Sequence, residues 1–454
     1  MKTSIQFAAA AALVVNLTAC NFLTGGELST NPNVSSTATA QNLFVGTQVA
    51  LWNELGGDMS RVTSIWAQHL TGELQQYAND NSYGLTEETT GGFHQGLYIT
   101  GGLVDMRHLQ AAATALHDSL FLGIAQVQEA WMMGEGADLF GDLVYSKALM
   151  GMTNPPLDSQ RVVYQHVEAL LDTAITNIAA LGQSNVGPGS VDLSSYAGDK
   201  VQWGHLAHTL KARFFMHQLH APWTTPTAMS DSALAQVLSG LAPGEDYNAQ
   251  FSGSVNQQNY WYQFNQGRAG YYVPSLTIID TLQSRNDTPL LQSYFNSSLN
   301  NLADARLQAN SPETLASYVE NELLWAEAAY RTGDATDALA HLRTARTAEG
   351  AVNPTYGNSP PTGLALLHAI LDEKWISDLQ LGTEAWTDYR RTCTPNLAPT
   401  IPNGIIPGRL FYDTGERQTN TNIPDAGVGI NGANNDGQPL LATSDGNGQT
   451  CLAR

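Results

Sequence analysis

Helical periodicity is the strongest structural signal in this sequence. Asp158 or Ser159 can cap the start of a helix that Gly182 can end. Between these residues, apolar side chains recur at steps of three and four, which places them on one helix face: Val163, Val167, Leu170, Leu171, Ala174, Ile178 and Leu181. Residues 200–220 repeat this spacing, whereas the alternation typical of strands is rare throughout. The sequence therefore predicts a mostly α fold.

A second helical block has the pattern of two helices joined by a tight turn. It is expected to start at Ser311-Pro312-Glu313, a cap followed by proline at the first helical position, and to break at Gly333-Asp334. This pattern predicts a tetratricopeptide-like helical hairpin, although the full repeat is not met and a plain helical hairpin gives a similar pattern. Residues 221–310 and the segment after 395 show little helical period. We therefore expect one large domain with long irregular loops.

The N-terminal residues predict export and lipidation. Lys2 precedes an apolar run that starts at Phe7 and closes on Leu17-Thr18-Ala19-Cys20, the arrangement of a bacterial lipobox. We expect residues 1–19 to be a signal peptide and Cys20 to carry the lipid, with residues 20–36 as a tether. An ordinary signal with a chance cysteine is the alternative. After Cys20 there is no apolar run of about 20 residues, so the lipid is the only membrane anchor that the sequence suggests.

The charge balance narrows the classes of ligand. The chain has 20 basic and 41 acidic residues, a formal net charge of −21. Such a surface repels phosphate backbones and anionic lipids, so we expect no nucleic-acid partner. Neutral ligands such as sugars or peptides remain compatible with this charge.

Two cysteines besides Cys20 are expected to form a disulfide. Cys393 and Cys451 are the remaining pair, and leftover thiols in exported proteins most often pair. By loop-closure reasoning the bridge would stabilise the fold by about 4 kcal/mol. A redox or metal pair is the alternative, but no C-x-x-C spacing supports it.

Catalytic and metal motifs are weak or absent in the sequence. Gly427, Gly429 and Gly432 fit a nucleotide-binding spacing but lack the flanking strand and helix. Four histidines, at 205, 208, 217 and 220, would spread over about 22 Å of one helix and cannot converge on one ion. Loops around Asp436 and Asp445 could hold calcium but lack the closing glutamate of a complete site. We therefore expect no catalytic residue, no cofactor and no metal site.

Aromatic residues among amides are the candidate ligand-binding residues. Aromatic faces beside amide groups suit sugars, whose C–H faces stack while their hydroxyls need hydrogen bonds. Trp261 is the leading candidate for stacking, in a segment without helical period. The other candidates are Tyr77, Tyr83, Tyr260, Tyr262, Arg268, Tyr271 and Tyr272. The alternative is that these rings close the core under long loops.

Six segments in order resemble the SusD/RagB family of outer-membrane nutrient-binding lipoproteins. Residues 136–148 are similar to the family's "G-D-x-P-Y-S-x-A" turn, with Val144 in the place of proline. Residues 373–375 (E-K-W) and 384–391 (E-A-W-T-D-Y-R-R) together match its late signature. The other similar segments are residues 30–33, 203–213, 325–346 and 407–420. One departure is that residues 21–23 lack the acidic run often taken as a surface-export tag.

The resemblance implies a non-catalytic binder on the outer membrane. It implies that residues 37–425 form a SusD-like helical domain, which captures an oligomeric nutrient and closes over a TonB-dependent SusC-like transporter. A glycan is the favoured ligand; a peptide, as for a RagB-like protein, and a scaffold for protein partners are the alternatives. Trp386 and Arg390 are then expected to be structural. Residues 426–454 form a Gly/Asn-rich tail that matches nothing in the family.

Overall fold

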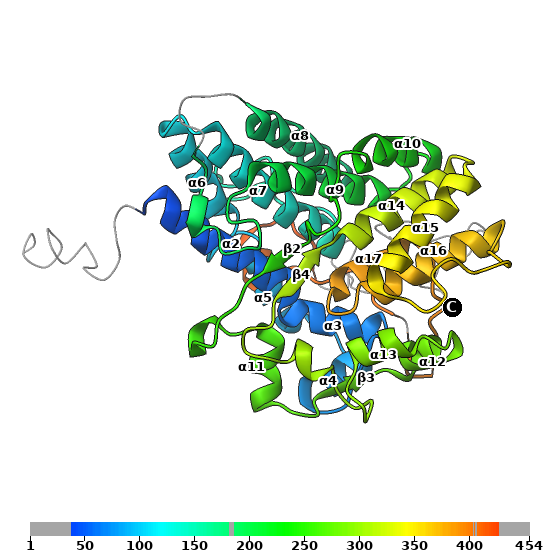
Figure 1. Cartoon of the computed structure of the whole chain (residues 1–454). Helices are drawn as coiled ribbons and strands as arrows, with labels where there is room; N and C mark the ends of the chain where they lie inside the picture. The colour runs from blue at the N-terminus through cyan, green and yellow to red at the C-terminus, as the bar shows by residue number, and fades with distance from the viewer. Residues whose placement is uncertain (1–37, 181–185, 403, 405, 426–454) are drawn as a thin grey trace, which may run out of the picture. The chain divides into compact units, whose positions relative to one another are not determined.

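The computed structural model describes residues 38–180, 186–402, 404 and 406–425 (Figure 1). The chain divides into two compact units, residues 1–42 and residues 43–454. In the first unit the described residues hold the start of helix α2 (Ala40–Gly56). The second unit holds the rest of α2 and every other described element. No helix in the described part of the chain combines the length and the apolar character that crossing a bilayer requires.

The long helix α7 (Ser119–Phe140) is the centre of the first helical group. It is buried along nearly its whole length because α6 (Leu103–Ala115), α8 (Gln160–Ala179) and α9 (Lys200–His217) all pack against it (Figure 1). Asp118 caps α7, since its carboxylate accepts a hydrogen bond from the N–H of Phe121 at 2.9 Å. The two helices predicted from periodicity, within residues 158–182 and 200–220, are confirmed as α8 and α9. Of the predicted apolar face, the buried residues are Val163, Val167, Leu171, Ala174 and Ile178.

The predicted helical hairpin is confirmed as α14 (Tyr318–Arg331) and α15 (Ala335–Glu349). Gly333 turns the chain with a φ of +97°, and Asp334 caps α15 by accepting from the N–H of Asp337 at 3.0 Å. Helices α10 (Pro226–Val237) and α16 (Leu364–Ser377) pack beside this hairpin (Figure 1). The hairpin and α16 share one apolar core, which includes Leu323, Leu342 and Ile370.

The expected start of this hairpin at residues 311–313 is wrong. Residues Glu313–Ala316 form strand β4, and α14 begins only at Tyr318. The Ser317 hydroxyl is the cap, accepting from the N–H of Glu320 at 3.0 Å. Strand β4 pairs with β2 (Tyr247–Ala249), so a partner distant in the sequence holds residues 313–316 in the extended form.

The expectation that residues 221–310 are irregular is also wrong. Besides α10, this region contains α11 (Tyr260–Gly267), α12 (Leu276–Ser284) and α13 (Thr288–Tyr294). Each of these is too short to show a clear period of three and four. Polar residues that suggested loops are instead caps: the Asn259 side chain accepts from the N–H groups of Trp261 and Tyr262 at 2.9 and 3.1 Å.

The strands are short and form two antiparallel pairs. Strand β1 (Leu70–Gly72) pairs with β3 (Tyr272–Pro274), with Thr71 opposite Val273. The β2–β4 pair carries a register shift between Tyr247 and Asn248. The remaining described helices are α3 (Asp58–Trp66), α4 (Gln75–Asn81), α5 (Glu87–Gly96), α17 (Gly382–Thr392) and α18 (Thr414–Thr419), with single 3-10 turns at Gly189–Val191, Val255–Gln257 and Asp304–Arg306.

A buried ionic network ties α7, α9, α14, α16 and α17 together. Glu384 lies at its centre, 3.1 Å from the guanidinium of Arg213 and 3.2 Å from the imidazole of His217. Every side chain in the network is at most 6% exposed. The network consists of Arg213, His217, Lys374 and Arg391 with Glu135, Asp138, Glu320, Glu327, Asp378, Glu384 and Asp388. Arg331, which is 12% exposed, pairs with Glu327 at the edge of this network.

The pairing within this network fixes the charge of its members. Burial alone would lower the pKa of His217, but Asp138 and Glu384 raise it to about 10, so the imidazole is charged at neutral pH. Burial alone would raise the pKa of Glu384, but Arg213 and His217 hold it well below its usual range. The network therefore holds four cations against carboxylates within the helical core.

Two residues of the late family signature are structural, as expected. Trp386 is fully buried, and its indole N–H donates to the carbonyl of Pro407 at 2.9 Å. The Arg390 guanidinium lies 3.7 Å from the centre of the Trp386 ring and donates to the carbonyl of Gly408 at 2.8 Å. Both side chains hold the segment after α17 against the helices.

Candidate functional site

A cavity of about 610 Å³ combines aromatic rings, aliphatic side chains and amides. We call it the aromatic cavity. One wall comes from α2, and the other comes from α11 and the segment between β2 and α11, with Leu193 beside them. Its lining residues are Val45, Val49, Trp52, Leu193, Gln250, Phe251, Ser252, Val255, Asn256, Gln257, Gln258, Tyr260 and Gln263. Its volume lies within the range of about 300–1,000 Å³ that small-molecule sites occupy.

Three aromatic side chains form a continuous edge-to-face series in this cavity. The ring of Phe251 lies 6.0 Å from that of Trp52 and 5.1 Å from that of Tyr260, with interplanar angles of 61° and 76°. Trp52 is only 2% exposed, and its indole N–H donates to the hydroxyl of Tyr247 at 3.0 Å. Phe251 and Tyr260 are half-buried, so they offer the accessible ring surface.

The amide side of the cavity is a compact loop, residues 252–258. The N–H of Ser252 donates to the carbonyl of Gln257 at 2.8 Å, and its hydroxyl donates to the Gln257 side chain at 2.9 Å. Gln263 on α11 donates to the carbonyl of Gln258 at 3.0 Å. These bonds fix the loop, while the amides of Gln250 and Asn256 have no hydrogen-bond partner within the described residues.

The aromatic cavity is electrically neutral. None of the described residues that line it carries a charged side chain, although the chain has a net charge of −21. Burial raises the pKa of Tyr260, and Glu313 raises it further, so the phenol stays protonated. Glu313 itself is buried, and burial raises its pKa to about 8 despite the hydrogen bond from Trp261. Its carboxyl group is therefore mostly uncharged at pH 7.

The expectation that the segment around Trp261 is irregular is wrong. Trp261 lies on α11, its side chain is fully buried, and its indole N–H donates to Glu313 at 2.9 Å. Its ring packs edge-to-face on Tyr272 and lies 5.6 Å from the guanidinium of Arg61. The ring therefore has no surface with which to stack on a ligand in this structure.

Three other candidate rings are also mostly buried. Tyr77 and Tyr272 are 0% and 3% exposed, and both rings stack on Phe264, which lies 4.5 Å from the guanidinium of Arg61. The Nε of Arg61 donates to the Tyr77 hydroxyl at 2.7 Å. Tyr83 is 8% exposed, and its hydroxyl accepts from the N–H of Thr400 at 2.9 Å. Their place in the core agrees with the alternative that such rings close the core under loops.

The remaining candidates divide between the cavity and the surface. Of the eight candidate residues, Tyr260 is the one that lines the aromatic cavity. Tyr262 and Tyr271 are half-buried and Arg268 is exposed, and these three lie outside the cavity lining. Trp52 and Phe251 also line this cavity, although the sequence did not indicate them as candidates. The run of amides at residues 256–259 next to Phe251 is the signal that could have found the loop, whereas only the fold brings Trp52 to it.

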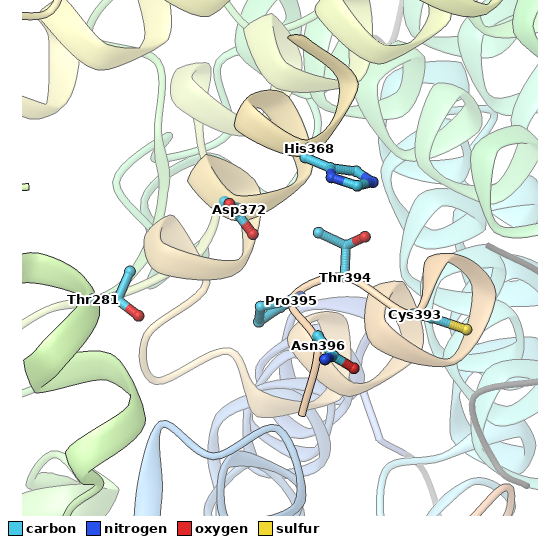
Figure 2. Close-up of a pocket in the computed structure, with 7 residues that line it drawn as sticks. All are labelled: Thr281, His368, Asp372, Cys393, Thr394, Pro395 and Asn396. Carbon is cyan, nitrogen blue, oxygen red and sulfur yellow. The ribbon is translucent and has the colours of Figure 1, made fainter. Parts of the chain in front are cut away.

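A second cavity, of about 350 Å³, lies between α12, α16 and the segment after α17 (Figure 2). His368 and Asp372 from α16 lie opposite Thr281 and residues 393–396. No aromatic residue other than the imidazole of His368 is among the described residues that line it. Because it lacks ring surface for stacking, it is a weaker candidate for ligand binding than the aromatic cavity.

The histidines of α9 and the segment after it have separate environments. His205 bonds to Glu245 at 2.6 Å, His208 bonds to Gln236 at 2.8 Å, and His217 belongs to the buried ionic network. Burial, with nearby arginines, lowers the pKa of His220 to about 4. They do not converge, which agrees with the helix geometry that the sequence predicts.

Two predicted sites, Cys20 and Cys451, fall outside the described residues. The motifs that the sequence does not support as sites, the glycines at 427–432, Asp436 and Asp445, also lie outside them. Cys393 is buried and takes part in a disulfide, but the predicted pairing with Cys451 stays a prediction.

Comparisons with known proteins identify the family. The sequence model of the SusD-like family, described as "Starch-binding associating with outer membrane", matches residues 32–305 and 291–413. No curated protein matches the chain by sequence. A structure titled as a chitin-binding SusD homologue from Flavobacterium johnsoniae is 19% identical, with a TM-score of 0.68, and the match covers 86% of this chain and 98% of that one.

Further solved structures share the fold. A SusD/RagB family protein from Bacteroides thetaiotaomicron is 19% identical with a TM-score of 0.66, covering 85% of this chain and 95% of its own. A SusD homologue from Bacteroides uniformis is 18% identical with a TM-score of 0.67, with the same coverage. The family match spans most of the chain and agrees with the resemblance seen in its motifs. The chain therefore belongs to the SusD-like family, whose members are non-catalytic binding proteins that associate with the outer membrane.

Proposed function

We propose that this chain binds an oligosaccharide in the aromatic cavity and delivers it, without catalysis, to a TonB-dependent SusC-like transporter. The observation that carries the proposal is the meeting of half-buried rings and free amides in one neutral cavity. The C–H faces of a sugar stack on Phe251 and Tyr260, and its hydroxyls exchange hydrogen bonds with Gln250 and Asn256.

A peptide ligand is the main alternative, and the charges of the cavity argue against it. Peptides carry charged termini and frequent charged side chains, and a buried charge needs a partner. The aromatic cavity provides no described charged side chain that could be that partner. A scaffold for protein partners would not need the accessible rings of Phe251 and Tyr260.

The membrane attachment belongs to the same proposal. Residues 1–19 would be removed, Cys20 would carry the lipid, residues 20–36 would form the tether, and residues 37–425 would form the binding domain on the cell surface. The family's association with the outer membrane supports this arrangement. Several acyl chains on one cysteine are sufficient for stable attachment without a spanning helix.

The decisive experiment compares two tyrosines of α11. Tyr260→Ala removes a ring that lines the cavity, whereas Tyr262→Ala removes a half-buried ring of the same helix outside the lining. A stacked ring contributes about 1 kcal/mol, so Tyr260→Ala should weaken glycan binding by roughly fivefold while Tyr262→Ala leaves it nearly unchanged.

Binding is measured by calorimetric titration with neutral oligosaccharides, chosen from a glycan array, and with a library of short peptides as the second arm. Melting curves check that both variants remain folded. Binding of peptides but of no saccharide would contradict the proposal, as would equal effects of the two variants on a saccharide that does bind.

A further inference from the structure

We propose that the aromatic cavity selects N-acetylated, uncharged sugar units over sugars that carry only hydroxyls. The inference rests on the proposed function and adds a chemical class of ligand to it. Three features of the cavity lead to it: an exposed aliphatic rim, two free amides and the absence of charge.

The aliphatic rim is the first feature. Val49, Leu193 and Val255 are 40%, 40% and 77% exposed, and all three line this one cavity. Exposed apolar side chains grouped at a concave site mark a binding surface. A sugar with hydroxyl groups alone uses ring surfaces and hydrogen bonds, but it has no methyl group to cover aliphatic side chains. The methyl of an acetamido group supplies such a contact.

The free amides are the second feature. Gln250 and Asn256 are exposed and unpartnered within the described residues, and each offers an N–H donor and a carbonyl acceptor. An acetamido group carries the complementary pair, one N–H and one carbonyl. A primary amide can therefore bond both of its polar atoms while the methyl covers the rim.

The absence of charge is the third feature, and it separates acetylated from free amino sugars. A free amino sugar brings an ammonium group, and a uronic acid brings a carboxylate. Neither would find an opposite charge among the described residues lining the cavity, so its desolvation would be uncompensated. Acetylation removes the positive charge and adds the methyl, which suits the cavity on both counts.

The test uses three β-1,4-linked tetrasaccharides of matched length: the N-acetylglucosamine oligomer, the glucose oligomer and the deacetylated glucosamine oligomer. Calorimetric titration should show the acetylated oligomer binding at least about tenfold more tightly than either of the others, at constant pH and salt. Equal or tighter binding of the glucose or glucosamine oligomer would overturn the inference.

Two matched variants connect the preference to the rim. Val255→Ser changes the most exposed residue of the rim, and Val201→Ser changes a 50% exposed valine on α9 outside the cavity. Val255→Ser should reduce the preference for the acetylated oligomer severalfold, whereas Val201→Ser should leave it unchanged. An unchanged preference in Val255→Ser would remove the rim from the explanation and overturn the inference.

Failure of this inference and failure of the proposed function give different results. Malto-, xylo- and manno-oligosaccharides form a further panel without acetamido groups. Binding of any of these, or of the glucose oligomer, without binding of the acetylated oligomer overturns the inference and leaves oligosaccharide binding intact. Binding of no saccharide in any arm overturns both.

Discussion

Replacement of Trp261 gives the sharpest test of how this region is built. Trp261→Ala empties a fully buried site, and truncation of a buried tryptophan costs about 3–5 kcal/mol. It also removes the one hydrogen bond that the Glu313 side chain makes among the described residues, which adds about 1–3 kcal/mol. The expected loss in the free energy of unfolding is therefore about 4–8 kcal/mol.

A second variant separates the ring from the hydrogen bond. Trp261→Phe keeps an aromatic ring against Tyr272 but cannot donate to Glu313, so it should lose about 1–3 kcal/mol. The hydrogen bond from Trp261 lowers the pKa of Glu313, so in this variant that pKa should rise further above 8. Tyr262 is half-buried on the same helix, so Tyr262→Ala is the control. It should lower the free energy of unfolding far less than Trp261→Ala does.

The assay is urea unfolding followed by circular dichroism, with the slope against urea compared between variants. Glycan titration runs in parallel on each variant that remains folded. If the free energy of unfolding of Trp261→Ala lies within about 1 kcal/mol of that of the unchanged protein, the ring is not part of the core. If affinity is lost while stability holds, Trp261 contacts the ligand and the placement described above is refuted.

Three further predictions concern pH, the disulfide and the lipid. In the folded protein the pKa of Glu313 is raised from 4.5 to about 8, so its contribution to the free energy of unfolding is full below pH 4.5 and is lost as the pH rises to 8. Urea unfolding at several pH values should therefore show a decline in this free energy between pH 4.5 and pH 8. Glu313→Gln should remove this part of the decline. Reduction of the predicted Cys393–Cys451 bridge should lower the free energy of unfolding by about 4 kcal/mol, and peptide mapping without reductant should show the crosslink, whereas two freely alkylated thiols would exclude it. Cys20→Ser should leave an uncleaved or soluble precursor, and intact-mass measurement of the native protein should find lipid on Cys20; a mature chain that starts elsewhere would contradict this.

The long helices could be predicted from the sequence because each buries one face. In α8, five apolar residues of the predicted face are buried, so the period in the sequence follows the packing of the helix. Helix α7 shows the opposite case, since it is buried on nearly all sides and presents no distinct face. Short helices such as α11 escape detection because their few turns are defined by a cap, Asn259, rather than by a period.

The candidate site was predicted only in part for a related reason. Aromatic residues in an amide-rich segment predict a ligand site as readily as a covered core, and the sequence does not say which ring faces inward. Tyr260 and Trp261 are neighbours on α11, and only the helix geometry sends one to the cavity and the other to Glu313. Trp52 lies about 200 residues from Phe251 in the sequence, so their contact depends on the completed fold.

The buried ionic network has a consequence for the conditions in which the fold can persist. Dissolved ions screen charges that face water, over a Debye length of about 8 Å at physiological ionic strength, but they cannot enter a dry interior. Arg213, His217 and Glu384 are each at most 2% exposed, so salt screens their attraction far less than it screens a pair of charges at the surface. The cell-surface position that we propose for this chain would expose it to water of changing salinity. Its helices would remain tied together by charge across that whole range.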